Sequence, residues 1–502
     1  MADRNTSLDP RTPVIIGVGQ INQRVDHGAE ALEPVDLMAE ALRRADADCA
    51  TTSPGAVVAG ADSIRVVSVL SWRYRDPGAL VAARVGASPR QSTYSTPGGN
   101  TPQALINSAA VDIATGRADL VLIAGAEAWR TRMGLRRDDQ RPVWTIQGDE
   151  VIPASTFGVD TPMSHPAEMA RGVMLPVQVY PLFEQALRAA EGRSVSDHLV
   201  RISELWAGFS EVAAKNPHAW IQQAFSATEL RTPSPDNRMI GFPYTKRLNS
   251  NNAVEQGASL ILSSVERARA LGVPAERWVF PQSGTDGHDT LFVSHRGDLH
   301  SSPAIRTAGR AALRLAGIDA DDLAHIDLYS CFPSAVQVAA KELGLGLDRP
   351  LTVTGGLSFA GGPWNNYVTH SVATMVERLR EEPGRFGLCT ANGGFLTKHA
   401  FGVYATTPPI AGFRHASPQA AIDAAGSREL AEDWAGAATV ESYTVMHDRD
   451  GAPVNAVVAA LTPEGRRTWA TTDDAGDLAS MTTDDLVGMA ATLGAEGRLT
   501  LG

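Results

Sequence analysis

The chain has 502 residues, of which 43% are hydrophobic and 20% charged, so its composition is that of a globular protein with two to four domains. The formal net charge of −12 argues against a general nucleic-acid or anionic-membrane binder, because phosphate groups would on average be repelled. The three cysteines, Cys49, Cys331 and Cys389, are too few and too scattered for a disulfide framework or a cysteine-rich metal site. The polar N-terminus (MADRNTSLDPRTP) and the lack of an apolar run of about 20 residues predict a cytoplasmic protein with no membrane span.

The first part of the chain alternates strand and helix patterns. Pro13 to Gly19 predicts a short buried strand, and Val35 to Arg44 predicts an amphipathic helix. A glycine-rich turn at residues 97–100 opens a predicted helix to about Thr115, and the apolar run Leu120 to Ile123 follows as a strand. Apolar runs of this kind that end in glycine are typical of strands covered by helices on both faces of a sheet.

The second half of the chain repeats this order, from a glycine-rich turn through a helix to a strand. The turn glycines Gly98 and Gly362 lie 264 residues apart, and the strand-end glycines Gly125 and Gly393 lie 268 apart. These near-equal offsets predict two copies of one α/β unit. The strand–helix alternation predicts a mainly parallel sheet in each copy.

Two further regions have patterns of their own. Residues 129–249 are richer in Pro, Trp and Met and predict an inserted loop domain with isolated helices. Beyond Pro409, the segments Val440–His447, Val454–Leu461 and Arg466–Thr472 are separated by tight turns, which predicts an antiparallel meander and a small β-barrel. The predicted domains are therefore 1–270 with the insertion, 271–408, and 409–502.

Two stretches carry a resemblance to a known family. They are YSTPGGNTPQALINSAAVDIATGRADLVLIAGAEA at Tyr94–Ala128, and the segment from His325 to Tyr404, which contains HIDLYSCFPSAVQVAAKELGL, TVTGGLSFAGGPWNN and GLCTANGGFLTKHAFGVY. Over roughly the first four-fifths of the chain they resemble the thiolase superfamily, in particular the sterol-carrier-type thiolases and the thiolase-like proteins related to them. The resemblance implies duplicated βαβαβ cores, an inserted loop domain that grips coenzyme A, and a function of the acetyl-CoA acetyltransferase kind in lipid metabolism. The predicted C-terminal barrel departs from the sterol-carrier lipid domain.

The resemblance also locates the expected catalytic positions. Thiolases use a cysteine nucleophile at a helix N-terminus, a second cysteine that moves the proton, and histidines in the oxyanion holes. The positions that match the family motifs here are Gly98, Tyr329, Gly362 and Ala391, and none has the expected side chain. This predicts a pseudoenzyme that cannot run standard thiolysis or Claisen condensation.

Other residues near these positions could supply replacement chemistry. Cys331 lies in the appropriate loop, although a lone cysteine on an apolar element is commonly an inert hydrophobic residue. Asn392 lies at the predicted end of a strand, and Thr397–His399 are expected in the returning loop, where α/β sheets place ligand groups. His399 is therefore a candidate base or thioester-oxygen donor, with a hydrogen-bonded structural histidine as the alternative.

Three residues at helix starts are candidates for binding the cofactor: Gly99, Asn100 and Gly362. Backbone N–H groups at such starts can cradle an anion, but tight turns and an ordinary N-cap explain the same residues. A basic cluster could form a mouth for a phosphorylated cofactor or a solvated basic face. Its members are Arg130, Arg132, Arg136, Arg137 and Arg141.

Three functions stay open at this point. The first is a degenerate thiolase that binds acyl-CoA or CoA, without a tightly bound cofactor. The second is an acyltransferase that uses His399 or Cys331 on a CoA thioester. The third is an assembly module whose C-terminal barrel binds a protein partner. The chain is expected to be a monomer or a thiolase-type homodimer, since thiolases pair near the strand Gln91 to Thr96.

Overall fold

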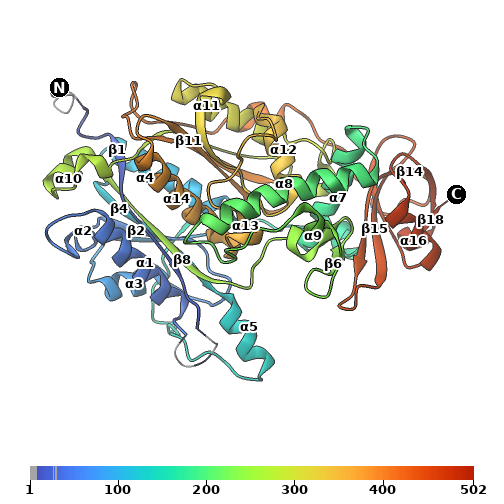
Figure 1. Cartoon of the computed structure of the whole chain (residues 1–502), viewed down its shortest axis with the longest axis horizontal. Helices are drawn as coiled ribbons and strands as arrows, with labels where there is room; N and C mark the ends of the chain where they lie inside the picture. The colour runs from blue at the N-terminus through green and yellow to red at the C-terminus, as the bar shows by residue number, and fades with distance from the viewer. Residues whose placement is uncertain (1–7, 26–27, 29–30, 502) are drawn as a thin grey trace.

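The computed structural model describes residues 8–25, 28 and 31–501, so the first seven residues of the predicted polar N-terminus lie outside the described part. Two sheets with their helices form the main body, and a third sheet forms the far end of the elongated molecule, near the C-terminus (Figure 1). This mixed α/β architecture confirms the predicted fold class. No helix in the described residues is long and apolar enough to cross a membrane.

The first sheet contains the strands predicted at Pro13 to Gly19, Gln91 to Thr96 and Leu120 to Ile123, together with three further strands. In spatial order they are β1 (Pro13–Asn22), β8 (Glu255–Ser264), β4 (Leu120–Ala128), β2 (Ser63–Val66), β3 (Gln91–Ser95) and β5 (Ser155–Phe157). Strands β4 and β8 are buried along their whole length, as expected for strands with helices on both faces. Helices α1 (Pro34–Asp48) and α3 (Pro77–Val85) pack on the outer face, beside the short α2 (Ala56–Ala59).

The second sheet repeats the first. Its order is β10 (Leu323–Asp327), β11 (Phe386–Gly393), β12 (Lys398–Ala405), β9 (Phe280–His288) and β13 (Arg414–Ala416). The series β9–β12–β11–β10 has the same sequence of antiparallel, antiparallel and parallel pairings as β1–β8–β4–β2. The shared pairing supports the predicted duplication. Because β13 joins this sheet, the second core extends past the predicted boundary at residue 408.

Both sheets are mixed. The prediction of a mainly parallel sheet holds for the first sheet, where three of the five strand pairs are parallel. It is wrong for the second sheet, where only two of the four strand pairs are parallel. The reason is visible at residues 394–397, which connect β11 directly to β12 in a turn of four residues. So short a connection can join only antiparallel neighbours. Residues 397–399 are therefore not the loop expected from the sequence, because Lys398 already begins a strand.

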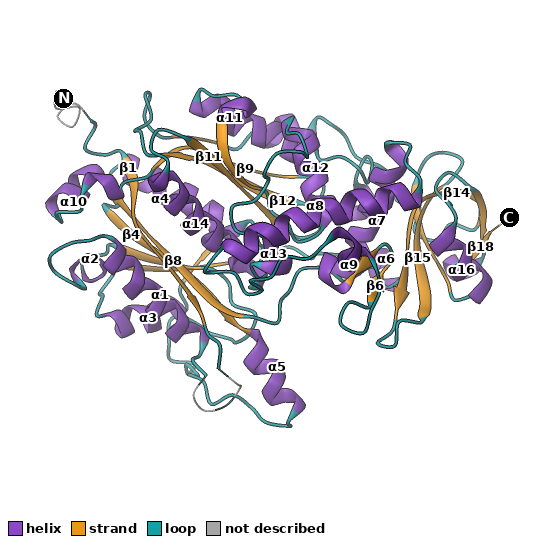
Figure 2. Ribbon diagram, viewed as in Figure 1, coloured by secondary structure: helices purple, strands orange, loops and turns teal. Residues whose placement is uncertain are grey.

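Helices form the layers between and outside the two sheets (Figure 2). Helices α4 (Thr101–Ala114) and α14 (Tyr367–Glu381) each contact strands of both sheets and form the central layer. Helices α11 (Arg310–Ala316) and α12 (Pro333–Leu343) lie on the outer side of the second sheet. The starts of α4 and α14 lie close together: the N–H of Gly98, just before α4, donates to Oδ1 of Asn365, just before α14, at 3.0 Å.

The inserted segment consists mainly of helices and of strands that pair with other parts of the molecule. Helices α7 (Pro176–Ala190) and α8 (Val195–Lys215) pack on α12, and α13 (Gly356–Phe359) packs on α8. The remaining short elements of the insertion are α5 (Trp129–Arg137), α6 (Pro166–Ala170), α9 (Ala227–Arg231), β6 (Met239–Gly241) and β7 (Tyr244–Thr245), and α10 (Val265–Ala270) follows β8.

The C-terminal sheet has the predicted antiparallel meander as its centre. Its order is β16 (Arg467–Thr472), β15 (Pro453–Leu461), β14 (Gly436–His447), β17 (Ala490–Leu493) and β18 (Leu499–Leu501), with α15 (Gln419–Asp423) before it and α16 (Ala475–Thr483) packed on it. The ladder stays open among the described residues, because β16 and β18 meet only through one bridge between Thr471 and Arg498. The sheet is therefore antiparallel as predicted, but it does not close into a barrel.

The C-terminal sheet is anchored to the rest of the chain. Strand β6 of the insertion pairs with β14 through Gly241 and Met446. The fully buried Arg467 pairs with Glu441, and its guanidinium donates to the carbonyls of Val293 and Arg296 at 3.0 and 2.6 Å. A buried cation with this many partners fixes the relative position of the two parts.

Candidate functional site

A cavity of about 570 Å³ lies where the two cores and the inserted segment meet. The two cores contribute their helix starts and strand ends, and the insertion contributes mainly apolar side chains. Its principal lining residues are Leu70, Gly98, Gly99, Met163, Leu175, Val177, Tyr180, Tyr329, Cys331, Phe332, Leu357, Trp364, Asn365, Asn392, Gly393 and Lys398.

The start of α4 forms the wall contributed by the first core. The Thr101 hydroxyl donates to the Gly98 carbonyl at 2.7 Å and closes the turn before the helix. Gly99 sits in a position with no room for a side chain: a Cβ there would lie 2.3 Å from the Tyr329 hydroxyl and 2.5 Å from the Asn392 carbonyl oxygen. Glycine is needed here because the second core approaches the backbone so closely.

Tyr329 occupies space at the centre of this wall. It follows β10 at the family position where thiolases have an oxyanion-hole histidine, and its ring packs edge-on against Tyr367 at 5.5 Å. Burial raises the pKa of its phenol, so the group stays neutral. The tyrosine therefore fills the space between the two helix starts with an uncharged side chain.

The other family positions are equally closed to thiolase chemistry. A Cβ at Gly98 would lie 2.5 Å from Asn100 Oδ1, and one at Gly362 would lie 2.2 Å from Ser250 Oγ. Ala391 is 1% exposed and lies in the wall of a small void behind the cavity. At Gly98 and Gly362, neighbouring side-chain atoms thus lie where a Cβ would be placed.

Cys331 and Asn392 line the cavity. Asn392 Nδ2 donates to the Tyr180 hydroxyl at 2.9 Å and lies 3.8 Å from Cys331 Sγ. Burial raises the pKa of the Cys331 thiol to about 12, although hydrogen bonds from Tyr180 and Asn392 act in the opposite direction. A thiol with this pKa is protonated at neutral pH and is a poor nucleophile.

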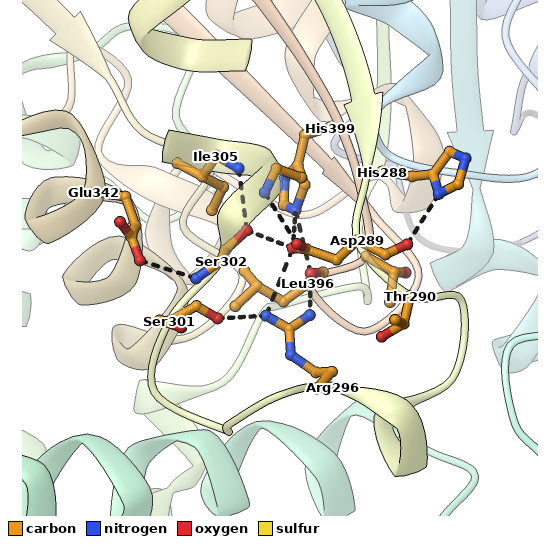
Figure 3. A network of polar contacts seen from close by, with 12 residues as sticks. His288, Asp289, Thr290, Arg296, Ser301, Ser302, Ile305, Glu342, Leu396 and His399 are labelled. Atoms are coloured by element: carbon orange, nitrogen blue, oxygen red, sulfur yellow. Dashed lines mark hydrogen bonds and ion pairs between the residues drawn. The ribbon is translucent and has the colours of Figure 1, made fainter. Parts of the chain in front are cut away.

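His399 is not among the residues that line the cavity, so it does not lie where a base or thioester-oxygen donor in this cavity would have to be. Consecutive residues of a strand point to opposite faces, so Lys398 at the start of β12 faces the cavity and His399 faces away. Figure 3 shows the His399 ring directed toward Asp289, and the two groups are 3.6 Å apart. His399 Nε2 also lies 3.1 Å from the Leu396 carbonyl oxygen.

Asp289 is the centre of the polar network behind the cavity wall (Figure 3). Burial acts to raise the pKa of Asp289, but Arg296 and His399 outweigh it and hold the pKa below its usual value. The Ser302 hydroxyl and the Ala304 N–H also donate to this carboxylate. His399 thus helps to hold the chain segment that follows β9.

The candidates for cofactor binding are only partly brought together. Gly99 lines the cavity, whereas Asn100 and Gly362 are not among its lining residues. Asn100 Oδ1 is buried without a hydrogen-bond partner in the described residues, and its side chain makes no N-cap hydrogen bond. The helix start of the second core reaches the cavity through Trp364 and Asn365 instead.

Lys398 is a cavity residue that the sequence analysis did not single out. Its Nζ donates to the Pro97 carbonyl at 3.0 Å, directly beside Gly98. Burial lowers the pKa of the ammonium, and Asp160 partly offsets this effect. The sequence could have indicated this position of Lys398 if the strand that starts directly after the turn at residues 394–397 had been recognised, because neighbouring side chains of a strand point to opposite faces.

The predicted basic cluster is centred on α5. Arg132 Nη1 donates to the Leu70 carbonyl at 2.8 Å, and Leu70 lines the cavity. The Trp129 ring contacts Trp364 at 4.9 Å, and the Arg132 guanidinium lies 5.3 Å from the Trp129 ring. The base of α5 is therefore adjacent to the cavity, whereas Arg136 and Arg137 at its far end are exposed.

Comparisons with known proteins agree with this geometry. Residues 418–498 match the family model of the thiolase-like protein type 1 additional C-terminal domain. The 3-ketoacyl-CoA thiolase of Photobacterium profundum is 26% identical over 149 residues, which are 29% of this chain and 36% of that enzyme. The match thus spans about a third of the length of this curated relative.

Two solved structures extend the comparison to the whole fold. The dimeric peroxisomal thiolase of Saccharomyces cerevisiae shares the fold with a TM-score of 0.55 at 14% identity, over 80% of this chain and 98% of that one. A monomeric SCP2-thiolase-like protein type 1 from Mycobacterium smegmatis is 33% identical, with a TM-score of 0.83 over 99% of this chain and 100% of that one. With this identity over the full length of both chains, the protein belongs to the SCP2-thiolase-like proteins of type 1.

Proposed function

We propose that this protein binds a coenzyme A thioester, or free coenzyme A, without covalent capture on a cysteine and without thiolase turnover. One observation carries the proposal: a cavity lies between the two cores, while Gly98 and Gly362 have no side chain and neighbouring atoms lie at their Cβ positions. Thiolysis requires a thiolate at the start of α4, and Gly98 has no side chain. A pocket without its nucleophile can still bind its ligand.

The size and lining of the cavity suit an acyl group and the pantetheine arm of coenzyme A. A volume of about 570 Å³ falls within the range typical of small-molecule sites. Apolar side chains such as Met163, Leu175 and Val177 offer contact to an acyl chain. Asn365 and Asn392 place amide groups in the same wall, where they can meet the polar groups of the arm.

The charges near the cavity support a phosphorylated ligand. Lys398 lines the cavity. Arg132 is held next to the cavity by its hydrogen bond to the carbonyl of Leu70, which also lines the cavity. The exposed Arg136 and Arg137 continue this positive charge along α5. In a chain with a net charge of −12, such a local group of cations favours an anionic ligand at this place.

The two alternative functions have less support. An acyltransferase that uses Cys331 would need a thiolate, and the pKa of about 12 opposes one. An acyltransferase that uses His399 would need this ring in the cavity, and it lies on the other face of β12. For an assembly module, the C-terminal sheet offers no feature in the described residues that specifies a partner.

Titration calorimetry with coenzyme A and octanoyl-CoA tests the proposal, with a cavity-filling variant as the comparison. Val177→Trp places a bulky ring in the cavity, and we expect it to weaken binding about tenfold or more, which is about 1.4 kcal/mol. Val200→Trp is the matched control, because Val200 is an exposed valine on α8 outside the cavity lining. Control and wild type should bind equally.

A thiolysis assay with acetoacetyl-CoA completes the test. We expect no turnover that approaches the usual enzymatic rate of about 10 per second, because no thiolate is available. Absence of binding at millimolar ligand, or turnover at an ordinary thiolase rate, would contradict the proposal.

A further inference from the structure

The amine of Lys398 stands beside the position where a thiolase has its nucleophile. A Cβ built on Gly98 would lie 3.3 Å from Lys398 Nζ, so the lysine reaches this place from the opposite core. The side chain is held there by its hydrogen bond to the Pro97 carbonyl. Gly98 has no nucleophilic side chain, but the amine of Lys398 lies directly beside it.

The surroundings favour the neutral form of this amine more than water does. Lys398 is partly buried, and burial lowers the pKa of its ammonium. Asp160, which also lines the cavity, is the carboxylate that acts in the other direction. Lysines that act as nucleophiles in proteins are activated by partial desolvation of this kind.

The composition of the chain makes this lysine unusual. Only four of the 44 Lys and Arg residues are lysines: Lys215, Lys246, Lys341 and Lys398. The first three are exposed, and Lys398 alone lines the cavity. An arginine can supply positive charge but stays protonated and does not act as an amine nucleophile.

We infer that Lys398 is an acyl acceptor that takes the acyl group from a thioester bound in the cavity, an inference that rests on the proposed function. The neutral Nζ attacks the thioester carbonyl carbon, so a C–N bond forms and the C–S bond breaks. The sulfur leaves with the bonding electrons as a thiolate and takes up the proton that the nitrogen loses. The products are an amide on Lys398 and the free thiol of coenzyme A.

An amide is far more stable than a thioester, so the acylation ends after one event per chain. It removes the positive charge of Lys398 and leaves the acyl group in the cavity, where it blocks a second ligand. The protein would then remain acylated at Lys398 after a single reaction with an acyl-CoA. This activity is modification of the protein itself and differs from thiolase turnover.

Mass spectrometry of the wild-type protein tests the inference, because the three exposed lysines serve as internal controls for uncatalysed acylation. The protein is incubated with octanoyl-CoA, and the acyl group is located on peptides over time. We expect Lys398 to be labelled about tenfold faster than Lys215, Lys246 or Lys341, because the cavity holds thioester and amine together. Intact mass should stop at one added group during this phase.

Two variants complete the design. Lys398→Arg keeps the charge but has no amine nucleophile, so the fast addition of one acyl group should disappear from its intact mass. Lys246→Arg changes an exposed lysine and should keep the fast label. If calorimetry shows binding but Lys398 is labelled no faster than the exposed lysines, the inference is overturned and the proposed function stands. If neither coenzyme A nor octanoyl-CoA binds, the proposed function fails and the inference fails with it.

Discussion

Single glycine positions explain why the site cannot be restored by a simple substitution. Gly98 has a φ of +154°, in the region that favours glycine, and its missing side chain would meet Asn100 Oδ1. Gly99 is equally constrained by the Tyr329 hydroxyl. The Gly98 contact arises within its own turn, and the Gly99 contact comes from the packing of the two cores.

Gly98→Cys should therefore yield no thiolase. We expect the variant to remain inactive toward acetoacetyl-CoA and to be less stable by about 1–3 kcal/mol, because the residue would be strained and crowded. Thermal unfolding and a thiolysis assay check both parts. Ser250→Cys is the control, since it places a thiol in the same cavity wall without a strained backbone and should change stability by no more than about 0.5 kcal/mol. Appreciable thiolysis by Gly98→Cys would contradict this account.

At the scale of elements, the contact between α14 and β1 carries a buried histidine. His370 is 6% exposed, and its Nδ1 lies 2.8 Å from Gln20 Oε1 on β1. Burial lowers the pKa of His370 to about 3, and the charge of His218 acts in the same direction. The helix is thus packed through a histidine that stays neutral in the folded protein.

This histidine should make the protein less stable in acid. An unfolded histidine takes up a proton below a pH of about 6.5, whereas folded His370 does so only near its pKa of about 3. The unfolded state therefore binds more protons between these values, and stability falls by up to about 1.4 kcal/mol for each pH unit below 6.5. Urea unfolding at pH 7 and pH 5 should show wild type losing about 2 kcal/mol more than His370→Gln.

The control for this experiment is His300→Gln, because His300 is about one-third exposed. It should lose stability between pH 7 and pH 5 as wild type does. Equal losses for wild type and His370→Gln would show that this histidine does not carry the effect.

At the scale of the whole molecule, the strand expected to mediate dimerisation is already covered. Strand β3 pairs in parallel with β5 of the same chain, with Thr93 opposite Ser155 and Ser95 opposite Phe157. Thiolase-type pairing near Gln91 to Thr96 would need this edge to be open. The chain's own insertion thus takes the place of a partner strand.

We therefore expect a monomer in solution. Light scattering on the eluted protein should give the mass of one chain, 53.1 kDa, over a range of concentrations. The mycobacterial relative described above is a monomeric protein. A stable species of twice that mass would contradict the covered-edge argument.

The sequence by itself determined the fold class, the duplicated cores, the C-terminal meander and the missing side chains at four family positions. These features depend on local periodicity, on turn residues and on motifs that can be aligned within one segment. Strand β12 was not recognised in this way, although it begins at Lys398. Because neighbouring side chains of a strand point to opposite faces, His399 points toward Asp289 and Lys398 lines the cavity.

Only the tertiary structure decided which candidates share a site. Gly98 and Lys398 are separated by 300 positions in the sequence, yet the two cores bring them into contact. Tyr329 was recognised as a replaced histidine, but its approach to Gly99 follows from the packing of one core on the other. Contacts of this kind depend on how separate elements pack, and no local pattern in a single sequence records that packing.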